Sequence, residues 1–83
     1  MEKASPKVKK ALMNAIKFQL KENNPPETKQ AYMRLLGEGI SEENVYIYLV
    51  QALVYELFAM MKEKRNHDSV NYAKLLAKLP NLD

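Results

Sequence analysis

The stretch from Val45 to Met61 is almost wholly apolar or aromatic, with only Gln51 and Glu56 interrupting it. A helix that is apolar on most of its circumference must be surrounded by its own fold, by a partner or by lipid. Lipid is disfavoured, because the stretch is at the short limit for a membrane span and a central Gln and Glu are costly in hydrocarbon. The stretch therefore predicts a long helix that needs cover from protein.

The size and composition of the chain limit the architectures available to it. The chain has 83 residues and no cysteine. A chain this short buries only about 60% of the surface that its unfolded form exposes, so it builds one small core. The absence of cysteine excludes a disulfide framework and a thiolate metal site. One domain is therefore expected, without the two lobes and the cleft of most enzymes.

Apolar residues recur at helical spacing over four segments, and no segment shows the period-2 alternation of a half-buried strand. The predicted helices span residues 6–21, 25–37, 42–65 and 69–79. The sequence thus predicts a single all-α domain of four helices, with the long apolar third helix as its central element.

Capping residues mark the predicted helix boundaries. The expected N-caps are Ser5, Asn24, Ser41 and either Asp68 or Ser69. The clearest is Ser41, because two glutamates follow it in the first turn, where the helix dipole favours them. Gly37 and Gly39 are the only glycines, and either can supply the left-handed residue that ends the second helix.

The third helix is the main candidate for a functional surface. Its three neighbours either surround it, as in a small bundle, or cover it in part and leave the rest to pair with a second copy. The candidate residues for such a homodimer interface are Val50, Leu53, Leu57 and Met61. A protein-interaction or structural module is the function class that this helix favours.

The sequence offers little support for catalysis. Glu56 is expected either to pair with a Lys or Arg from another helix or to lie at a rim. An acid–base site needs a partner group, and His67, the only histidine, lacks the further ligands that a metal requires. No phosphate-binding, dinucleotide-binding or nucleophile-elbow motif is present. We therefore expect a protein that is not an enzyme and has no cofactor and no metal.

The whole chain has a net charge of +3, and its positive charge is concentrated near the start of the sequence. Four lysines gather on one side of the first helix: Lys7, Lys10, Lys17 and Lys21. A basic helix face can bind the phosphate groups of a nucleic acid, so association with nucleic acid is the alternative function. The simpler interpretation is a solvated face, because the stripe has no arginine and no interleaved aromatic residue for base stacking.

Motifs over residues 23–80 resemble a group of small uncharacterised bacterial helical domains. They are Asn24-Pro25-Pro26-Glu27, Leu35-Leu36 followed by Gly39-Ile40-Ser41-Glu42-Glu43, an apolar helix with Glu56, and a close of Tyr72, Leu76 and Leu79-Pro80. Asn44-Val45 departs from the pattern, where alanine is usual. The resemblance implies a helical fold and carries no activity and no site residues. With no secretory signal and no cysteine, we expect a cytoplasmic bacterial protein.

Overall fold

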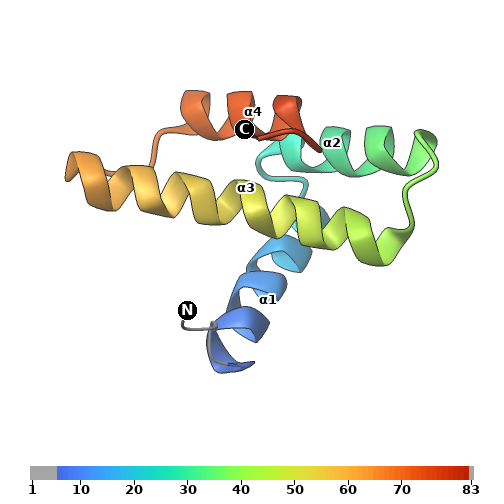
Figure 1. The fold of residues 1–83 in the computed structure, drawn as a ribbon, viewed down its shortest axis with the longest axis horizontal. Coiled ribbons are helices and arrows are strands. Elements are labelled where there is room, and N and C mark those ends of the chain that lie inside the picture. Colours follow the sequence, from blue (N-terminus) through green and yellow to red (C-terminus); the bar gives the residue numbers. More distant parts are fainter. Residues whose placement is uncertain (1–5, 83) are drawn as a thin grey trace.

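The computed structural model describes residues 6–82 and contains four helices joined by short loops (Figure 1). They are α1 (Pro6–Glu22), α2 (Pro26–Gly37), α3 (Glu42–Glu63) and α4 (Ser69–Lys78). No strand occurs in this range, so the predicted all-α class is confirmed, and the observed boundaries lie close to the predicted ones. The N-cap expected at Ser5 lies outside the described residues.

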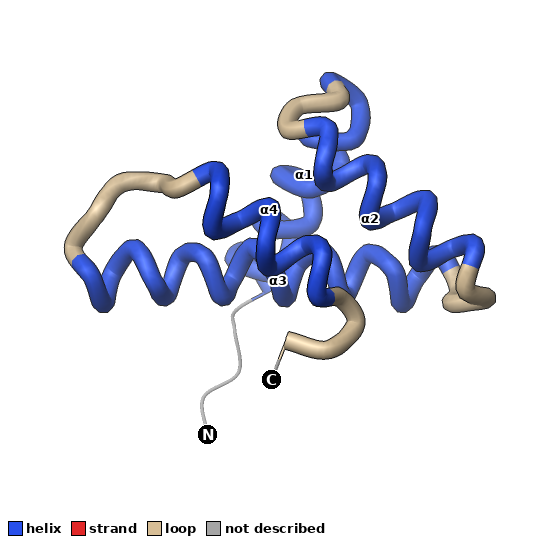
Figure 2. The backbone as a smooth tube through the Cα atoms, turned by 90° about the horizontal axis from the view of Figure 1, so that it is seen from above, coloured by secondary structure: helices blue, strands red, loops and turns tan. Residues whose placement is uncertain are grey.

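Helix α3 is the longest element, and it packs against all three of the others. Helices α2 and α4 lie over the same side of α3 (Figures 1 and 2). Helix α1 crosses α3 and packs on α2 and α3 with its C-terminal half, while its N-terminal half projects from the body (Figure 1). This half is exposed from Pro6 to Ala11.

Local sequence sets most of the helix ends. Ser41 is the N-cap of α3, and its hydroxyl accepts a backbone N–H from the first turn at 3.3 Å. Asp68 is the N-cap of α4, and its carboxylate accepts two backbone N–H groups. The prediction for Asn24 is wrong, because its backbone N–H bonds back to the carbonyl of Gln19 and closes α1. Pro25 takes the N-cap position of α2 without a side-chain cap.

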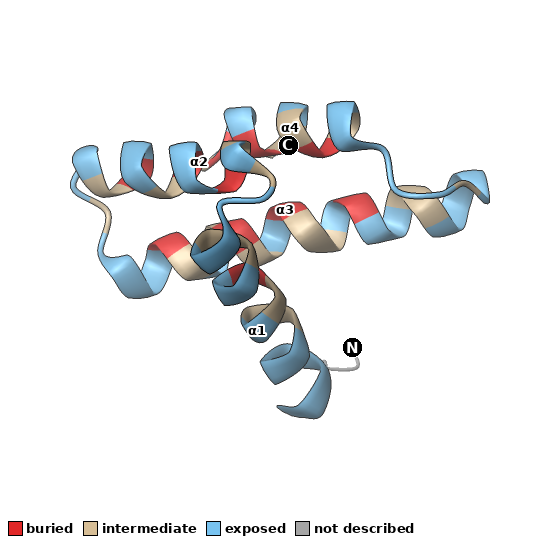
Figure 3. Cartoon of the chain, turned by 180° about the vertical axis from the view of Figure 1, so that it is seen from behind, coloured by how far each residue is buried: buried red, intermediate tan, exposed pale blue. Residues whose placement is uncertain are grey.

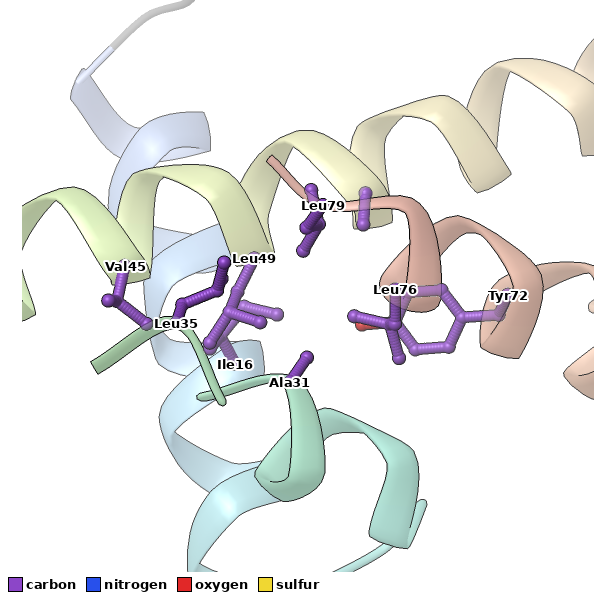
Figure 4. Packing of buried hydrophobic residues seen from close by; sticks show 9 residues of the cluster. Ile16, Ala31, Leu35, Val45, Leu49, Tyr72, Leu76 and Leu79 are labelled. Carbon is purple, nitrogen blue, oxygen red and sulfur yellow. The ribbon is translucent and has the colours of Figure 1, made fainter. Parts of the chain in front are cut away.

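The core is a single cluster of nine apolar side chains drawn from all four helices and the residue after α4. They are Ile16, Ala31, Leu35, Val45, Leu49, Ala52, Tyr72, Leu76 and Leu79 (Figure 4). The apolar faces predicted for α2 and α4 therefore point inward. Only Ile16 among them comes from α1, so α1 is held to the body by one turn and its immediate neighbours.

A buried polar contact joins three helices beside this core. The hydroxyl of Thr28 on α2 donates to Oε1 of Gln19 on α1 at 2.7 Å, and the hydroxyl of Tyr72 on α4 donates to the same oxygen at 3.0 Å. Burial raises the pKa of Tyr72, which stays protonated and donating at neutral pH. No buried side-chain polar atom between residues 6 and 82 lacks a hydrogen-bond partner.

The two glycines at the end of α2 should respond oppositely to alanine. Gly39 has a φ of +89°, whereas Gly37 is helical, and an added Cβ meets no atom within 4 Å at either position. We expect Gly39→Ala to lower the free energy of unfolding by about 1–2 kcal/mol through left-handed strain. Gly37→Ala should raise it by up to ~1 kcal/mol through helix propensity. Urea unfolding followed by circular dichroism measures both, and shifts of the same sign would contradict this assignment.

Candidate interaction surface on α3

The outer side of α3 carries a row of apolar side chains that the fold leaves partly or wholly uncovered. Along this row, Ile47, Val50, Val54, Leu57 and Met61 follow one another in alternate steps of three and four residues. This is the spacing of the apolar seam of a coiled-coil helix. Phe58 widens the row and is 63% exposed. These six residues are named the α3 seam.

The core uses the opposite side of the same helix. Val45, Leu49, Ala52 and Glu56 are buried, and at 100° per residue they fall within an arc of about 60°. The seam occupies an arc of roughly 100° whose centre lies almost opposite. Figure 3 shows buried segments on the side of α3 that faces α2 and α4, with exposed segments elsewhere. In the single chain, the three neighbouring helices therefore cover α3 only in part.

The four predicted interface residues differ from one another in how exposed they are in the structure. Met61 is 73% exposed and Leu57 is 38% exposed, so both are open to a partner. Val50 is half-buried at the middle of the seam and also touches the core. Leu53 packs against the core from the arc next to it and is not part of the seam.

Three seam residues were missed in the sequence, namely Ile47, Val54 and Phe58. Ile47 and Val54 could have been recognised from their spacing, because apolar residues follow one another in alternate steps of three and four residues from Ile47 to Met61. Phe58 lies outside this alternation. In a helix that is apolar almost all round, the same residues also fit a buried face. Only the position of the other helices distinguishes the two, so the spacing was ambiguous.

Glu56 is fully buried, and its carboxylate accepts hydrogen bonds from several directions. Arg65 donates through both terminal nitrogens, Nη1 to Oε2 at 3.0 Å and Nη2 to Oε1 at 3.1 Å. The backbone N–H of Asp68 donates at 2.9 Å and Nδ2 of Asn71 at 2.6 Å. The rim position considered for Glu56 is therefore wrong. Its charged partner comes from the loop after α3 and not from another helix.

This cluster fixes the path of the loop between α3 and α4. The hydrogen bonds from Arg65, and then those from Asp68 and Asn71, outweigh burial and lower the pKa of Glu56 to about 2. The same contact raises the pKa of Arg65, so both groups stay charged. Because the carboxylate binds residues before and inside α4, it sets where that helix begins. The geometry is that of a structural ion pair.

His67 also lies beside Glu56. Its Nδ1 is 3.3 Å from Oε2 of Glu56, and its half-exposed ring packs against the ring of Tyr72 in a T-shaped arrangement. The groups that donate hydrogen bonds to Glu56 are a guanidinium, a backbone amide and a side-chain amide. No group of three or more His, Asp or Glu side chains between residues 6 and 82 could hold a metal ion.

A pocket of about 220 Å³ lies between α2 and α4. Its lining consists of Glu27, Gln30, Ala31, Arg34, Ala73, Leu76 and Ala77. The guanidinium of Arg34 donates to the carbonyl oxygens of Leu76 and Leu79 at 3.1 and 2.9 Å. Arg34 therefore caps the end of α4. The lining includes no Ser, Cys or His, and Glu27 is its one carboxylate.

The predicted basic face is present on α1. Lys7, Lys10, Lys17 and Lys21 are exposed, and Nζ of Lys17 lies 6.0 Å from the centre of the Tyr46 ring. Phe18 was overlooked in the sequence, and it is 64% exposed at the edge of this stripe. An aromatic ring therefore borders the stripe, although none is interleaved between its lysines.

Helix α3 is long and apolar enough to cross a membrane when length and composition alone are considered. The core helix of a soluble protein passes the same test. In this fold α3 contributes four buried residues to the interior, and one of them is the charged Glu56. These contacts favour α3 as a core helix, and its position outside a membrane stays a prediction.

Comparison with protein-family models, with curated proteins and with solved structures finds no match for this chain.

Glu56→Gln should remove a pH-dependent part of the stability. The pKa of Glu56 is about 2 in the folded chain against an ordinary value of 4.5. The ionised carboxylate therefore stabilises the fold above pH 4.5, and this stability is lost as the pH falls from 4.5 towards 2. We expect the parent protein to lose ~2 kcal/mol more than the variant over that range.

Urea unfolding at a series of pH values measures this difference. The control is Glu22→Gln, because Glu22 is exposed at the end of α1, and its curve should follow that of the parent protein. Parallel pH curves for the parent protein and Glu56→Gln would show that the cluster does not stabilise the fold as an ion pair.

Proposed function

We propose that this protein is a small, non-enzymatic interaction module that associates with a second copy of itself through the α3 seam. The observation that carries the proposal is the uncovered row of apolar side chains on the outer side of α3, opposite the core. Burying such a row against protein is favourable because it removes apolar surface from water.

The size of the exposed row suits a dimer interface. Ile47, Leu57, Phe58 and Met61 are between 38% and 73% exposed. With ~200 Å² for each fully exposed side chain, they present roughly 400 Å² of apolar surface. Two copies would bury about 800 Å², which corresponds to ~1,300 Å² of interface, since about 60% of an interface is apolar. Stable interfaces bury roughly 1,200–2,000 Å².

A charge in the seam should abolish self-association. We expect light scattering to give the mass of a dimer for the parent protein and of a monomer for Leu57→Glu, because the carboxylate would be buried without a partner. Met61→Glu, at the most exposed seam position, repeats the test without a risk to folding. The control is Val70→Glu, which places the same charge on the exposed side of α4 and should leave the dimer intact.

The outcome against the proposal is equally clear. A parent protein that is monomeric from micromolar to millimolar concentration would exclude the seam as a self-association surface. Circular dichroism of each variant verifies that the helices are retained.

The alternative function is binding of nucleic acid by the basic face of α1. The observation in its favour is exposed Phe18 beside Lys17 and Lys21, because lysines bind phosphates and an aromatic ring stacks on bases. Fluorescence anisotropy with a labelled single-stranded oligonucleotide should then give binding that weakens steeply with salt. Phe18→Ala and Lys10→Gln should each reduce it. Absence of binding at low salt would exclude this function.

A further inference from the structure

We infer that the second copy docks on the α3 seam in an antiparallel orientation, so that the N-terminal end of each α3 lies beside the C-terminal end of the other. This inference rests on the proposed self-association and specifies its geometry. Three features of the seam support it: the charges at its two ends, the helix dipole and the order of its apolar residues.

The charges at the two ends of α3 have opposite sign. Glu42 and Glu43 occupy the first turn, and Lys62 and Lys64 lie at the other end, all of them exposed. Glu63 also lies at the basic end, where it is bound by Nε of Arg65 at 2.6 Å. A parallel pair would place glutamates against glutamates and lysines against lysines. An antiparallel pair places each acidic end beside a basic end, which is the favourable arrangement.

The charges flank the apolar part of the seam at both ends of the helix. Glu43 lies in the first turn of α3, four residues before Ile47, and Lys64 is the left-handed C-cap, three residues after Met61. An apolar centre therefore lies between a carboxylate at one end of α3 and an ammonium at the other. The helix dipole adds to the same preference, since the positive end of each helix meets the negative end of the other.

The apolar residues also pair well in this orientation. In an antiparallel coiled-coil contact, the first position of one repeat faces the fourth position of the other helix. Ile47 then faces Leu57 of the second copy, and Val50 faces Val54 of the second copy. Beyond them, Glu43 meets the Met61 end of the second copy, with the ammonium of Lys64 one turn further. Small β-branched side chains lie at the centre and longer ones towards the ends, where the helices have room to diverge.

Cysteine cross-linking tests the orientation directly, because the chain has no cysteine of its own. Ile47→Cys and Leu57→Cys are prepared separately, one of them with a short tag, and are mixed at equal concentration under mild oxidation. A disulfide needs Cα atoms within ~4.4–6.8 Å of each other, so only facing positions react. The antiparallel pair predicts a mixed disulfide that joins one chain of each variant, with little of either homodimer, as read on a non-reducing gel.

Charge exchange gives an independent test. Glu43→Lys and Lys64→Glu should each weaken dimerisation about threefold to tenfold at low salt, because each places like charges together at the interface. The double variant restores opposite charges and should recover most of the affinity. In a parallel dimer, each position faces the same position of the second copy. Like charges would therefore still face each other in both single variants and in the double variant.

The outcomes separate this inference from the function on which it rests. A parent protein that stays monomeric overturns both. A dimer that gives disulfides between two copies of Ile47→Cys, or none at all, overturns the antiparallel arrangement and leaves the self-association standing. Recovery of affinity in the double variant together with the mixed disulfide supports the antiparallel dimer.

Discussion

The apolar circumference of α3 is the constraint on which the other elements of the fold depend. In this fold, the three shorter helices cover α3 only in part. The fold places the available cover on one side, with α2 and α4 over α3 and the C-terminal half of α1 packed beside them (Figure 1). The side of α3 that faces away from α2 and α4 therefore stays largely uncovered.

Glu56 shows how the same constraint acts on a charged residue. Its place on α3 lies in the buried arc, so the carboxylate must be desolvated when the core forms. Arg65, Asn71 and the backbone N–H of the α4 cap replace the lost water. The hydrogen bonds that compensate for burying this charge also bind α3 to the loop that leads into α4.

Function in this chain is proposed from a surface and not from a cluster of reactive groups. Three polar side chains stabilise the fold: Gln19 joins three helices, Arg34 caps α4, and Glu56 binds the loop after α3. The exposed features that bear on function are the α3 seam and the lysines of α1 with Phe18. The seam has the stronger argument, because its spacing, area and end charges all suit one partner of the same kind.

The helices and most of their ends could be predicted from local sequence, whereas the cover on α3 and the partner of Glu56 could not. The caps at Ser41 and Asp68 and the left-handed residue at Gly39 act within a few residues, so they need no knowledge of the fold. In a helix that is apolar on nearly all sides, the sequence pattern does not show which face is buried. The pairing of Arg65 with Glu56 requires the chain to turn back after α3, and packing of α4 on the core fixes that turn.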